Sequence, residues 1–399
     1  MNVFVLPSWY PSGTSPAAGV FVREQVLALA RERQAFQFTV AGWGHLDGAL
    51  SLRDPARSAR ALAWRLRHCS SVWRELAPRV HELTTPALSW TLGLAGGGAG
   101  GLLRASRRNL ALATERFGRP ALIHAHVGYP AGWIAACLSR ETLIPFVVTE
   151  HMSPFPFPAL AQGSGHGLAR LRWASERAQA VIAVSPSLAD QMRQHGVRCT
   201  HNIPNLVDTA RLTCCLSPQA PPFTFFSLGG PSPQKGTDLL LRALQASAFP
   251  AGQVRLVIGG GGDEAGHYAR LAQYLGVANA VDWLGPVSPV DVPRRMAECH
   301  AFVLASRHES FGVVLIEALA SGRPVIATCS GGPAAIVHAG NGLLVKVEDV
   351  PALTAALQWM VTHAQGFDPA TLRADAEARF GSAAVARRIA AVYDEVGQP

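Results

Sequence analysis

The sequence predicts an α/β protein with two domains, each built around a parallel β-sheet. The chain has 399 residues, more than one ordinary core of about 100 to 200 residues. Short apolar runs typical of buried strands alternate with longer segments of helical periodicity, which is the pattern of βαβ units. This alternation forms two series, separated by a Pro-rich and weakly patterned segment at residues 206–222. We therefore expect two Rossmann-like domains at residues 1–205 and 223–381, joined by a linker.

The apolar runs give the expected strands in order. In the first half they occupy residues 1–7, 36–43, 121–127, 146–151 and 180–186. In the second half they occupy residues 223–230, 255–261, 280–285, 301–306, 324–328 and 342–347. The final segment, residues 382–399, has helical periodicity through Val385, Ile389 and Val392. It is expected to form a helix that either closes the second domain or crosses back to the first.

Composition excludes several classes of protein. Apolar residues make up 49% of the chain and charged residues only 16%, so the chain is not of the disordered class. The seven cysteines include no C-x-x-C pair, which argues against a disulfide framework or zinc ribbon and favours a reducing, cytoplasmic location. The N-terminus lacks the basic region of a secretion signal. The uncharged stretch 83–103 contains six glycines, which favours a loop over a membrane-spanning helix.

The excess positive charge lies in the first half of the chain. Residues 1–210 carry 21 Arg, no Lys and 12 acidic residues, whereas residues 211–399 are close to neutral. In segment 56–76, apolar residues recur at spacings of three and four with arginines on other faces, which predicts a basic amphipathic helix. The apolar positions are Ala59, Leu62, Leu66, Cys69, Trp73 and Leu76, and the arginines are Arg57, Arg60, Arg67 and Arg74.

Such a helix can pack on the first domain, or it can contact anionic lipid headgroups or a phosphorylated lipid acceptor. The second interpretation predicts peripheral attachment to the inner face of a membrane. Nucleic acid is the least favoured partner, because the sequence contains no nucleic-acid motif.

Two carboxylates mark the most informative segment, Ala305–Thr328. Glu309 follows an apolar run, and Glu317 lies inside the apolar helix expected at residues 312–320. On one helix their eight-residue spacing corresponds to about 12 Å. A glycosidase needs its two carboxyl groups within about 5 to 9.5 Å, so contact with separate parts of one elongated ligand fits better. Two surface glutamates are the alternative, but an unpaired carboxylate within an apolar helix is costly, so Glu317 should accept a hydrogen bond.

The order of strand, loop, helix and Ser-Gly-Arg-Pro-Val turn around these glutamates resembles glycosyltransferase family 4, whose members are retaining enzymes with the two-lobed GT-B fold. The resemblance extends over nearly the whole chain, and Glu309 and Glu317 match the family's E-x7-E signature. It implies two Rossmann-like domains whose parallel sheets face a central cleft, with residues 1–205 on the acceptor side and residues 223–381 binding the nucleotide sugar. It also implies that Glu309 lies beside the donor sugar ring and that Glu317 hydrogen-bonds the ribose hydroxyls of the nucleotide.

Residues 227–244 resemble the family's strand, phosphate loop and helix, with Lys235 in the place of its lysine. The chain has 33 Arg and only two Lys, so a lysine here departs from its habit, which a compact ammonium beside a phosphate loop explains. The family's usual arginine five positions earlier is Gly230 in this chain. One half of the family's cationic clamp on the diphosphate is therefore missing, and Arg307 and Arg323 are candidates to replace it.

Further site residues are implied in the first domain. Gly19 matches the family's glycine at the start of the first helix, where backbone N–H groups can face the donor phosphates. A dinucleotide-binding fold is the alternative for this loop, but its G-x-G-x-x-G fingerprint is absent. His126 matches the family's strand-end histidine, and Glu150 and His151 match its strand-end Thr-x-His region. Because open α/β sheets bind ligands at the carboxyl ends of their strands, these side chains are expected to contact the sugar or the acceptor.

In the second domain, Leu284 lies in segment 281–287, which resembles the loop that recognises the nucleotide base. Gly331 and Gly332 resemble the family's glycine pair, which lets backbone amides approach the donor. The glutamate that usually follows is Ala335 here, so the sugar specificity stays open.

The resemblance implies transfer of a hexose from a nucleotide diphosphate sugar to a glycan or polyprenyl-linked acceptor, with retention of configuration. The expected catalytic residues are Glu309, Lys235 and His126. No cofactor and no obligatory metal are expected, and the sequence has no D-x-D pair. Two alternatives stay open. Gly230 and Ala335 fit a nucleotide-sugar-binding scaffold subunit that has lost catalysis, and a GT-B-like sugar epimerase or phosphorylase would share most of these features.

Overall fold

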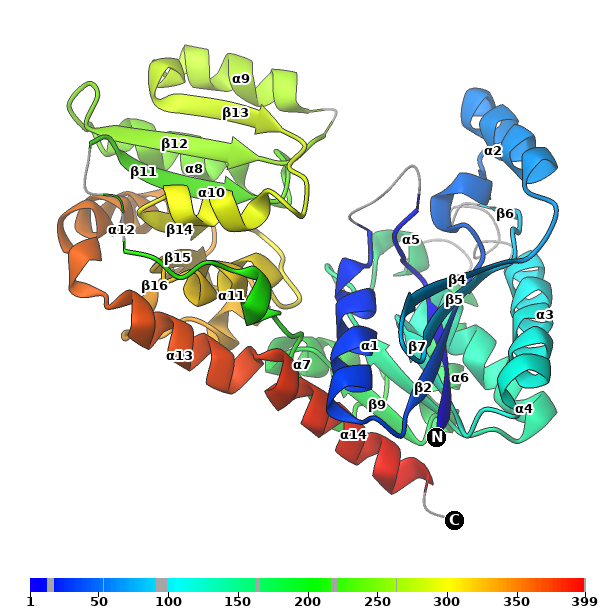
Figure 1. The fold of residues 1–399 in the computed structure, drawn as a ribbon. Coiled ribbons are helices and arrows are strands. Elements are labelled where there is room, and N and C mark those ends of the chain that lie inside the picture. Colours follow the sequence, from blue (N-terminus) through cyan, green and yellow to red (C-terminus); the bar gives the residue numbers. More distant parts are fainter. Residues whose placement is uncertain are drawn as a thin grey trace. The chain divides into compact units, whose positions relative to one another are not determined.

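The computed structural model describes residues 1–12, 18–52, 54–90, 99–161, 166–216, 218, 221–262 and 264–397. The chain divides into two compact units. Met1–Asn205 and Val385–Pro399 form the first unit, and Leu206–Ala384 form the second. Each unit is a mainly parallel sheet flanked by helices, which confirms the predicted α/β class with two Rossmann-like domains (Figure 1).

The first unit contains an eight-stranded sheet in the order β10-β9-β8-β7-β1-β2-β5-β4. Neighbouring strands are parallel except β4 and β5, which are antiparallel. The strands are β1 (Asn2–Pro7), β2 (Gln37–Gly42), β4 (Val72–Ala77), β5 (Val80–Thr84), β7 (Leu122–His126), β8 (Phe146–Glu150), β9 (Ala180–Ala183) and β10 (His201–Asn202). A separate short pair joins β3 (Ala49–Leu50) to β6 (Ser89–Trp90).

The helices of the first unit follow its strands. They are α1 (Val20–Glu32), α2 (Pro55–Arg67), α3 (Gly100–Phe117), α4 (Trp133–Thr142), α5 (Pro158–Ala161), α6 (His166–Arg177) and α7 (Pro186–Gln194). The last helix, α14 (Ser382–Gly397), begins in the second unit and from Val385 belongs to the first.

The second unit contains a six-stranded parallel sheet in the order β13-β12-β11-β14-β15-β16. Its strands are β11 (Phe223–Leu228), β12 (Val254–Gly259), β13 (Val281–Gly285), β14 (Ala301–Leu304), β15 (Val325–Thr328) and β16 (Gly342–Val345). Its helices are α8 (Thr237–Ala246), α9 (Ala265–Tyr274), α10 (Val292–Glu298), α11 (Val313–Ala320), α12 (Val350–His363) and α13 (Pro369–Phe380).

Strand order defines where each sheet can bind a ligand. The second sheet runs 3-2-1-4-5-6 in chain order, which is the doubly wound arrangement. Its winding reverses between β11 and β14, and that of the first sheet reverses between β1 and β7. Ligands bind such sheets beyond the carboxyl ends of the strands at the reversal. The loops after these four strands are therefore where site residues should lie.

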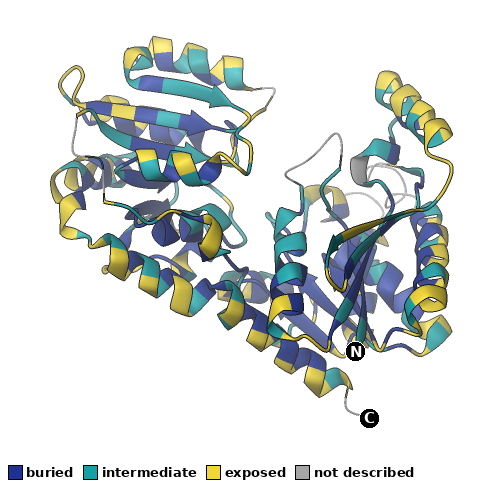
Figure 2. Cartoon of the chain, in the orientation of Figure 1, coloured by how far each residue is buried: buried dark blue, intermediate teal, exposed yellow. Residues whose placement is uncertain are grey.

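The cores explain why the strands read as unbroken apolar runs. β7, β8, β14 and β15 are buried over their whole length, because helices cover both faces of a parallel sheet. Figure 2 shows the contrast between these buried strands and the helices, which keep exposed faces toward solvent.

The basic amphipathic helix predicted at residues 56–76 is wrong beyond Arg67. α2 begins after Asp54, whose Oδ1 accepts from the backbone N–H of Arg57 at 2.9 Å, and it ends at Arg67. Residues 72–77 instead form β4, because this segment pairs with β5. The apolar side of α2 is also not packed inward, since Leu62 and Leu66 are 48% and 78% exposed.

The uncharged stretch 83–103 contains the end of β5, the strand β6 and the start of α3. Residues 91–98, on which most of the predicted loop falls, lie outside the described residues. In the described parts of the chain, no helix combines the length and apolar character needed to cross a bilayer.

Candidate functional site

The loop between β11 and α8 positions Lys235. The backbone N–H of Lys235 donates to the Ser232 carbonyl at 3.1 Å. Gly236 follows with φ 62°, and a Cβ at this position would lie 2.0 Å from the carbonyl oxygen of Ala305. Only glycine permits this approach, so the Lys235 loop packs directly against the chain that follows β14.

The loop after β14 positions Glu309. This residue lies four positions before α11 and not on it, so a helical spacing to Glu317 does not apply. Its backbone N–H donates to the Ser330 carbonyl at 3.0 Å, and its own carbonyl accepts from Gly332 at 2.8 Å. A Cβ on Gly332 would lie 2.2 Å from Cα of Phe311. Backbone hydrogen bonds thus join the loops after β14 and β15, and they fix the position of the Glu309 backbone.

Lys235 and Glu309 meet at the reversal of the second sheet. The Lys235 Nζ lies 2.7 Å from Oε2 of Glu309, although the two residues are 74 positions apart. The Lys235 side chain is 26% exposed and that of Glu309 is 13% exposed. Because both remain accessible, the ammonium and the carboxylate form an ion pair that a charged ligand can reach.

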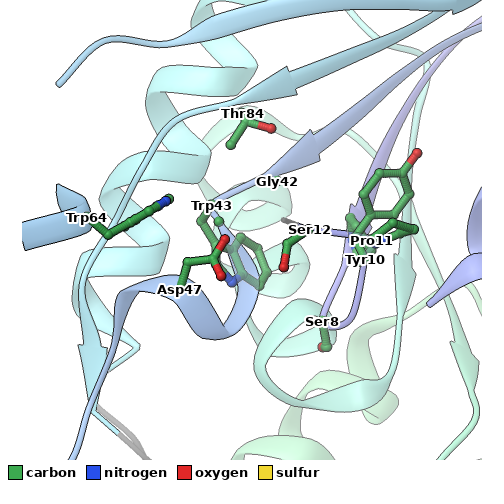
Figure 3. A pocket seen from close by; sticks show the side chains of 11 residues that line it. Ser8, Tyr10, Pro11, Ser12, Gly42, Trp43, Asp47, Trp64 and Thr84 are labelled. Carbon is green, nitrogen blue, oxygen red and sulfur yellow. The ribbon is translucent and has the colours of Figure 1, made fainter. Parts of the chain in front are cut away.

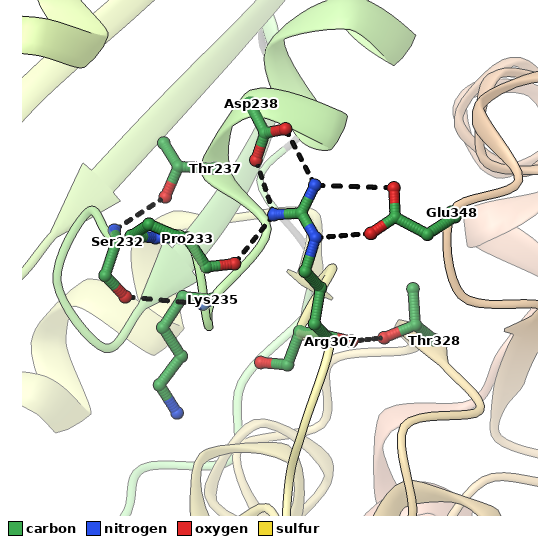
Figure 4. A network of polar contacts seen from close by, with 9 residues as sticks. Ser232, Pro233, Lys235, Thr237, Asp238, Arg307, Thr328 and Glu348 are labelled. Carbon is green, nitrogen blue, oxygen red and sulfur yellow. Dashed lines mark hydrogen bonds and ion pairs between the residues drawn. The ribbon is translucent and has the colours of Figure 1, made fainter. Parts of the chain in front are cut away.

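Arg307 organises the Lys235 loop. Its guanidinium donates to both carboxylate oxygens of Asp238, at 2.7 and 2.8 Å, and to the Pro233 carbonyl at 2.7 Å (Figure 4). It also donates to Glu348. The hydrogen bonds to these carboxylates raise the pKa of Arg307, and the same contact lowers the pKa of Asp238. Arg307 therefore stabilises the conformation of the Lys235 loop.

Neither arginine proposed to replace the missing cation is available. Arg307 is engaged as described, and Arg323 is fully buried. Its guanidinium donates to the carbonyl oxygens of Met296, Cys215 and Leu216 at 3.1 to 3.2 Å. The expectation that either one serves the diphosphate is therefore wrong.

Gly230 has a structural reason of its own. Its φ is 81°, and a Cβ there would lie 2.4 Å from the carbonyl oxygen of Gly261. An arginine at this position would require a different packing of the loops after β11 and β12. At position 335, where the family usually has a glutamate, this chain has alanine, which has no polar side chain. The backbone carbonyl of Ala335 accepts a hydrogen bond from Arg379 at 2.6 Å.

Of the other predicted residues of the second unit, the two adjacent glycines are in direct contact with Glu309. Gly331, with φ 123°, pairs with Glu309 in an isolated parallel bridge. Glu317 lies half-buried on α11. Leu284 is half-buried near the carboxyl end of β13, the outermost strand on that side and two strands from β11. The second unit thus brings Lys235, Glu309 and Gly331 into contact, whereas Glu317 lies within α11 and Leu284 lies on the outermost strand.

In the first unit, His126 ends β7 beside the reversal. It is fully buried, and its Nδ1 lies 3.1 Å from Nε2 of His151. Its Nε2 has no hydrogen-bond partner among the described residues. Burial lowers the pKa of His126 well below its ordinary value, with repulsion from His124 and His151 adding to the effect. His126 is therefore a neutral imidazole whose hydrogen-bonding capacity is not fully used.

Glu150 has a different role from its neighbour. Its carboxylate accepts from the backbone N–H groups of Gly128, His151 and Met152 at 2.7 to 2.9 Å. Burial raises the pKa of Glu150, while these hydrogen bonds oppose that shift. The carboxylate is thus occupied by the turns that follow β7 and β8, and we assign it a positioning role in place of contact with an acceptor.

Gly19 lies at the start of α1 with φ 64°, and a Cβ there would lie 2.1 Å from the carbonyl oxygen of Trp9. The close approach of the Trp9 carbonyl is therefore enough to explain why residue 19 is a glycine. Contact of Gly19 with phosphate stays a prediction.

Comparisons with known proteins cover both units. The model of Glycosyltransferase Family 4 matches residues 20–211, and that of Glycosyl transferases group 1 matches residues 196–377. The chain belongs to glycosyltransferase family 4.

Relatives of this family 4 chain are recognised over part of their length. A D-inositol 3-phosphate glycosyltransferase of Rhodococcus opacus is 30% identical over 271 residues, which are 61% of the chain and 59% of the relative. An uncharacterised glycosyltransferase of Methanocaldococcus jannaschii is 30% identical over 228 residues, which are 56% of the chain and 61% of the relative. The chain thus matches less than two thirds of these relatives.

Solved structures of the GT-B type resemble the whole chain in fold. The Anabaena protein Alr3699/HepE, crystallised with UDP, has a TM-score of 0.70 at 22% identity and covers 99% of this chain and 100% of its own. A sucrose-phosphate synthase of Thermosynechococcus elongatus has a TM-score of 0.74 at 20% identity and covers 99% of both chains.

Two residues of this family 4 chain that support His126 have no counterpart in the sequence prediction. His124 lies beside His126 with ring centroids 4.2 Å apart, and it bonds the Tyr393 hydroxyl at 2.6 Å and the Thr149 hydroxyl at 2.8 Å. The sequence offers one sign of His124, because two histidines alternate in β7. It offers no sign of Tyr393, because only the fold brings α14, and Tyr393 with it, into the first unit.

Proposed function

We propose that this family 4 chain transfers a hexose from a nucleotide diphosphate sugar to a hydroxyl of a glycan or lipid-linked glycan, with retention of configuration. The observation that carries the proposal is the Lys235–Glu309 pair at the reversal of a 3-2-1-4-5-6 sheet. A cation suits the diphosphate and a carboxylate suits the sugar hydroxyls, so one extended donor can engage both.

In the proposed reaction, Lys235 acts on the leaving group. Its ammonium stabilises the charge that builds on the diphosphate as the bond from the anomeric carbon to the phosphate oxygen breaks. The acceptor oxygen forms the new bond to the anomeric carbon from the same face, and its proton passes to the departing phosphate. The backbone N–H groups at the start of α8 add positive potential near the loop. No obligatory metal is expected in this scheme.

Glu309 has a separate part in the proposed reaction. Donor binding must exchange its ion pair with Lys235 for contacts with the ligand, which frees the carboxylate to hold sugar hydroxyls. The neutral His126 is suited to hydrogen-bond a hydroxyl of the sugar or acceptor through Nε2, and we do not assign it as general base. The bound UDP of the Anabaena protein supports a nucleotide diphosphate sugar as the donor class.

We also propose that the protein attaches to an anionic membrane surface through α2. The exposed Leu62 and Leu66 lie one helical turn apart, and α2 carries four arginines and no acidic residue. Binding to vesicles containing phosphatidylserine should weaken in a triple Arg57→Gln, Arg60→Gln, Arg67→Gln variant. A triple variant of exposed arginines elsewhere, Arg104→Gln, Arg108→Gln, Arg242→Gln, has the same charge change and should bind as the wild type. Equal loss in both variants, or none in either, would refute the α2 assignment.

The test of the main proposal has two steps. First, UDP-, GDP- and ADP-sugars are screened for protection against thermal unfolding, where a donor at 100 times its Kd adds about 2.7 kcal/mol. Transfer from the protecting donor is then followed by NMR, which reports the anomeric configuration of the product.

Variants identify the residues responsible. Lys235→Ala and Glu309→Gln should each lower transfer by about 10² to 10³. Lys346→Ala changes the chain's other, exposed lysine and should leave transfer unchanged. Near-normal transfer by both site variants would overturn the assignments.

The uncompensated Gly230 favours one second candidate, a subunit that binds nucleotide sugars without transferring them. Binding of a donor with neither transfer nor hydrolysis across a panel of acceptors would support that candidate.

A further inference from the structure

We propose that a pocket in the first unit, walled by Trp43 and Trp64, binds one uncharged saccharide ring of the acceptor. This inference rests on the proposed transferase function. It narrows the acceptor side implied for the first domain to one pocket and one chemical class of ligand. The pocket is a cavity of about 200 Å³ within the first unit (Figure 3).

The pocket lies at the carboxyl edge of the first sheet. Its lining includes Ser8 just after β1, Gly42 at the end of β2 and Thr84 at the end of β5. These three strands are neighbours in the sheet. The pocket therefore occupies the edge at which an open α/β sheet binds its ligands.

The fold admits the indole of Trp64 at a specific place. Gly44 has φ 87°, and a Cβ there would lie 2.1 Å from the Trp64 ring. A Cβ on Gly48 would lie 3.3 Å from the same ring. Glycine at position 44 thus leaves the space into which α2 inserts its tryptophan, and this aromatic wall is a built feature.

Two more aromatic side chains complete the apolar surface. Trp43 is almost fully buried beside the pocket, and Tyr10 lines its other side. The Tyr10 hydroxyl donates to Oε1 of Glu82 at 2.6 Å, which fixes the orientation of the ring. Rigid aromatic faces suit the C–H faces of a pyranose ring, which are its only apolar surface.

Polar groups lie between these faces. Asp47, Ser12 and Thr84 line the same cavity (Figure 3). A carboxylate and hydroxyls can bond the hydroxyls on the rim of a sugar ring, and an apolar site with a few placed polar groups is the usual form of a small-molecule pocket.

Charge and size narrow the ligand class. Asp47 is the charged side chain among the described residues that line the pocket. A carboxylate repels phosphate, so a phosphorylated sugar or a nucleotide fits poorly. Pockets for drug-sized ligands measure about 300 to 1,000 Å³, so this smaller cavity fits a single ring.

His126 does not line the pocket, but it lies on the strand next to β1 in the same sheet. Pro7 pairs with His126 in the register of β1 and β7, and the backbone N–H of Ser8 donates to the His126 carbonyl at 3.1 Å. A saccharide in the pocket therefore lies beside a strand, β1, whose neighbour β7 ends in His126.

The test uses the full chain with saturating UDP and saturation-transfer NMR on single saccharides. The probes are the methyl glycosides of glucose, galactose, mannose and N-acetylglucosamine, with glucose 6-phosphate as the charged comparison. At least one methyl glycoside should bind, and glucose 6-phosphate should bind more weakly than methyl glucoside.

Variants locate the binding. Trp64→Ala should weaken saccharide binding about tenfold, the upper range for loss of one aromatic face. Asp47→Asn should weaken it with little effect on thermal stability, which keeps the test valid if Trp64→Ala folds poorly. Trp359→Ala removes a partly exposed tryptophan of the second unit and should change nothing. The protection by UDP should persist in all three.

The outcomes separate this inference from the proposed function. If UDP and nucleotide sugars fail to protect the wild type, the proposed function fails. If they protect it but no methyl glycoside binds, or Trp64→Ala and Asp47→Asn bind like the wild type, the pocket is not the acceptor subsite. Tighter binding of glucose 6-phosphate than of methyl glucoside would overturn the assignment of an uncharged ring.

Discussion

Lowering the pH from 7.5 to 5 should destabilise the first unit through its buried histidines. Burial lowers the pKa of both His124 and His151 to about 3, from the ordinary value of 6.5. Between these two values the unfolded chain binds protons that the folded unit excludes. The stability contributed by these two neutral histidines is therefore fully present above pH 6.5, and it is lost as the pH drops toward 3.

The size of the effect follows from these shifts. Each histidine contributes about 1.4 kcal/mol per pH unit within the window, which is about 2 kcal/mol at pH 5. Together the two account for about 4 kcal/mol of unfolding free energy. For a unit of this size that corresponds to a fall of about 8 to 16 °C in Tm.

The assay is urea unfolding of the full chain at several pH values, compared between variants. His124→Gln should reduce the dependence of the unfolding free energy on pH by about 1.4 kcal/mol per unit between pH 6 and 4. His267→Gln, at an exposed position of the second unit, should leave it unchanged. The carboxylates are the same in all three proteins, so the difference reports the loss of His124 together with the loss of its repulsion toward His126 and His151. An unchanged dependence in His124→Gln would refute the reasoning.

Two further predictions concern side chains behind the sites. Tyr393→Phe removes the hydroxyl that bonds His124 at 2.6 Å and should lower the unfolding free energy by about 1 to 3 kcal/mol in calorimetry. Tyr274→Phe, at an 88% exposed position, is its control, and an equal loss in both would contradict this account. Arg307→Gln gives up the bidentate contact with Asp238 and should raise the donor KM about tenfold in initial-rate measurements, with a smaller change in kcat. A kcat that falls while KM stays constant would contradict a bracing role.

The sequence predicts the architecture well because buried parallel strands have a distinctive sequence pattern. Helices cover both faces of such strands, so each reads as one continuous apolar run, and residues 301–306 and 324–328 are clear cases. Segment 56–76 contains no continuous apolar run that would distinguish its strand from a helix. Its apolar spacing satisfies a helix throughout, but pairing with β5 takes residues 72–77 into the sheet.

The candidate site was predictable where residue types are distinctive. Lys235 stands out as one of only two lysines in a chain with 33 arginines, and Glu309 stands out after a buried strand. Their contact depends on the reversal of strand order between β11 and β14, which no local pattern reveals. The supporting roles of Arg307 and Arg323 were out of reach for the same reason, since a lone arginine gives no sign of which carboxylate or carbonyl it will meet.

Glycines illustrate a further limit. The sequence suggests that Gly19 makes room for a ligand, whereas the structure shows a close approach by Trp9. Gly44 gives no sequence signal, yet it admits the Trp64 ring. A missing side chain predicts a near neighbour without saying what that neighbour is.

The return of α14 to the first unit has a consequence for biosynthesis. Residues 206–384 form the second unit as one uninterrupted stretch, but the first unit needs residues from Val385 onward, including the partner of His124. During synthesis, the first unit is thus completed only after the whole second unit has been made. Until α14 has been synthesised, the rest of the first unit leaves exposed the apolar surface on which Tyr393 later packs, including Phe36, and such transiently exposed surface is prone to aggregate.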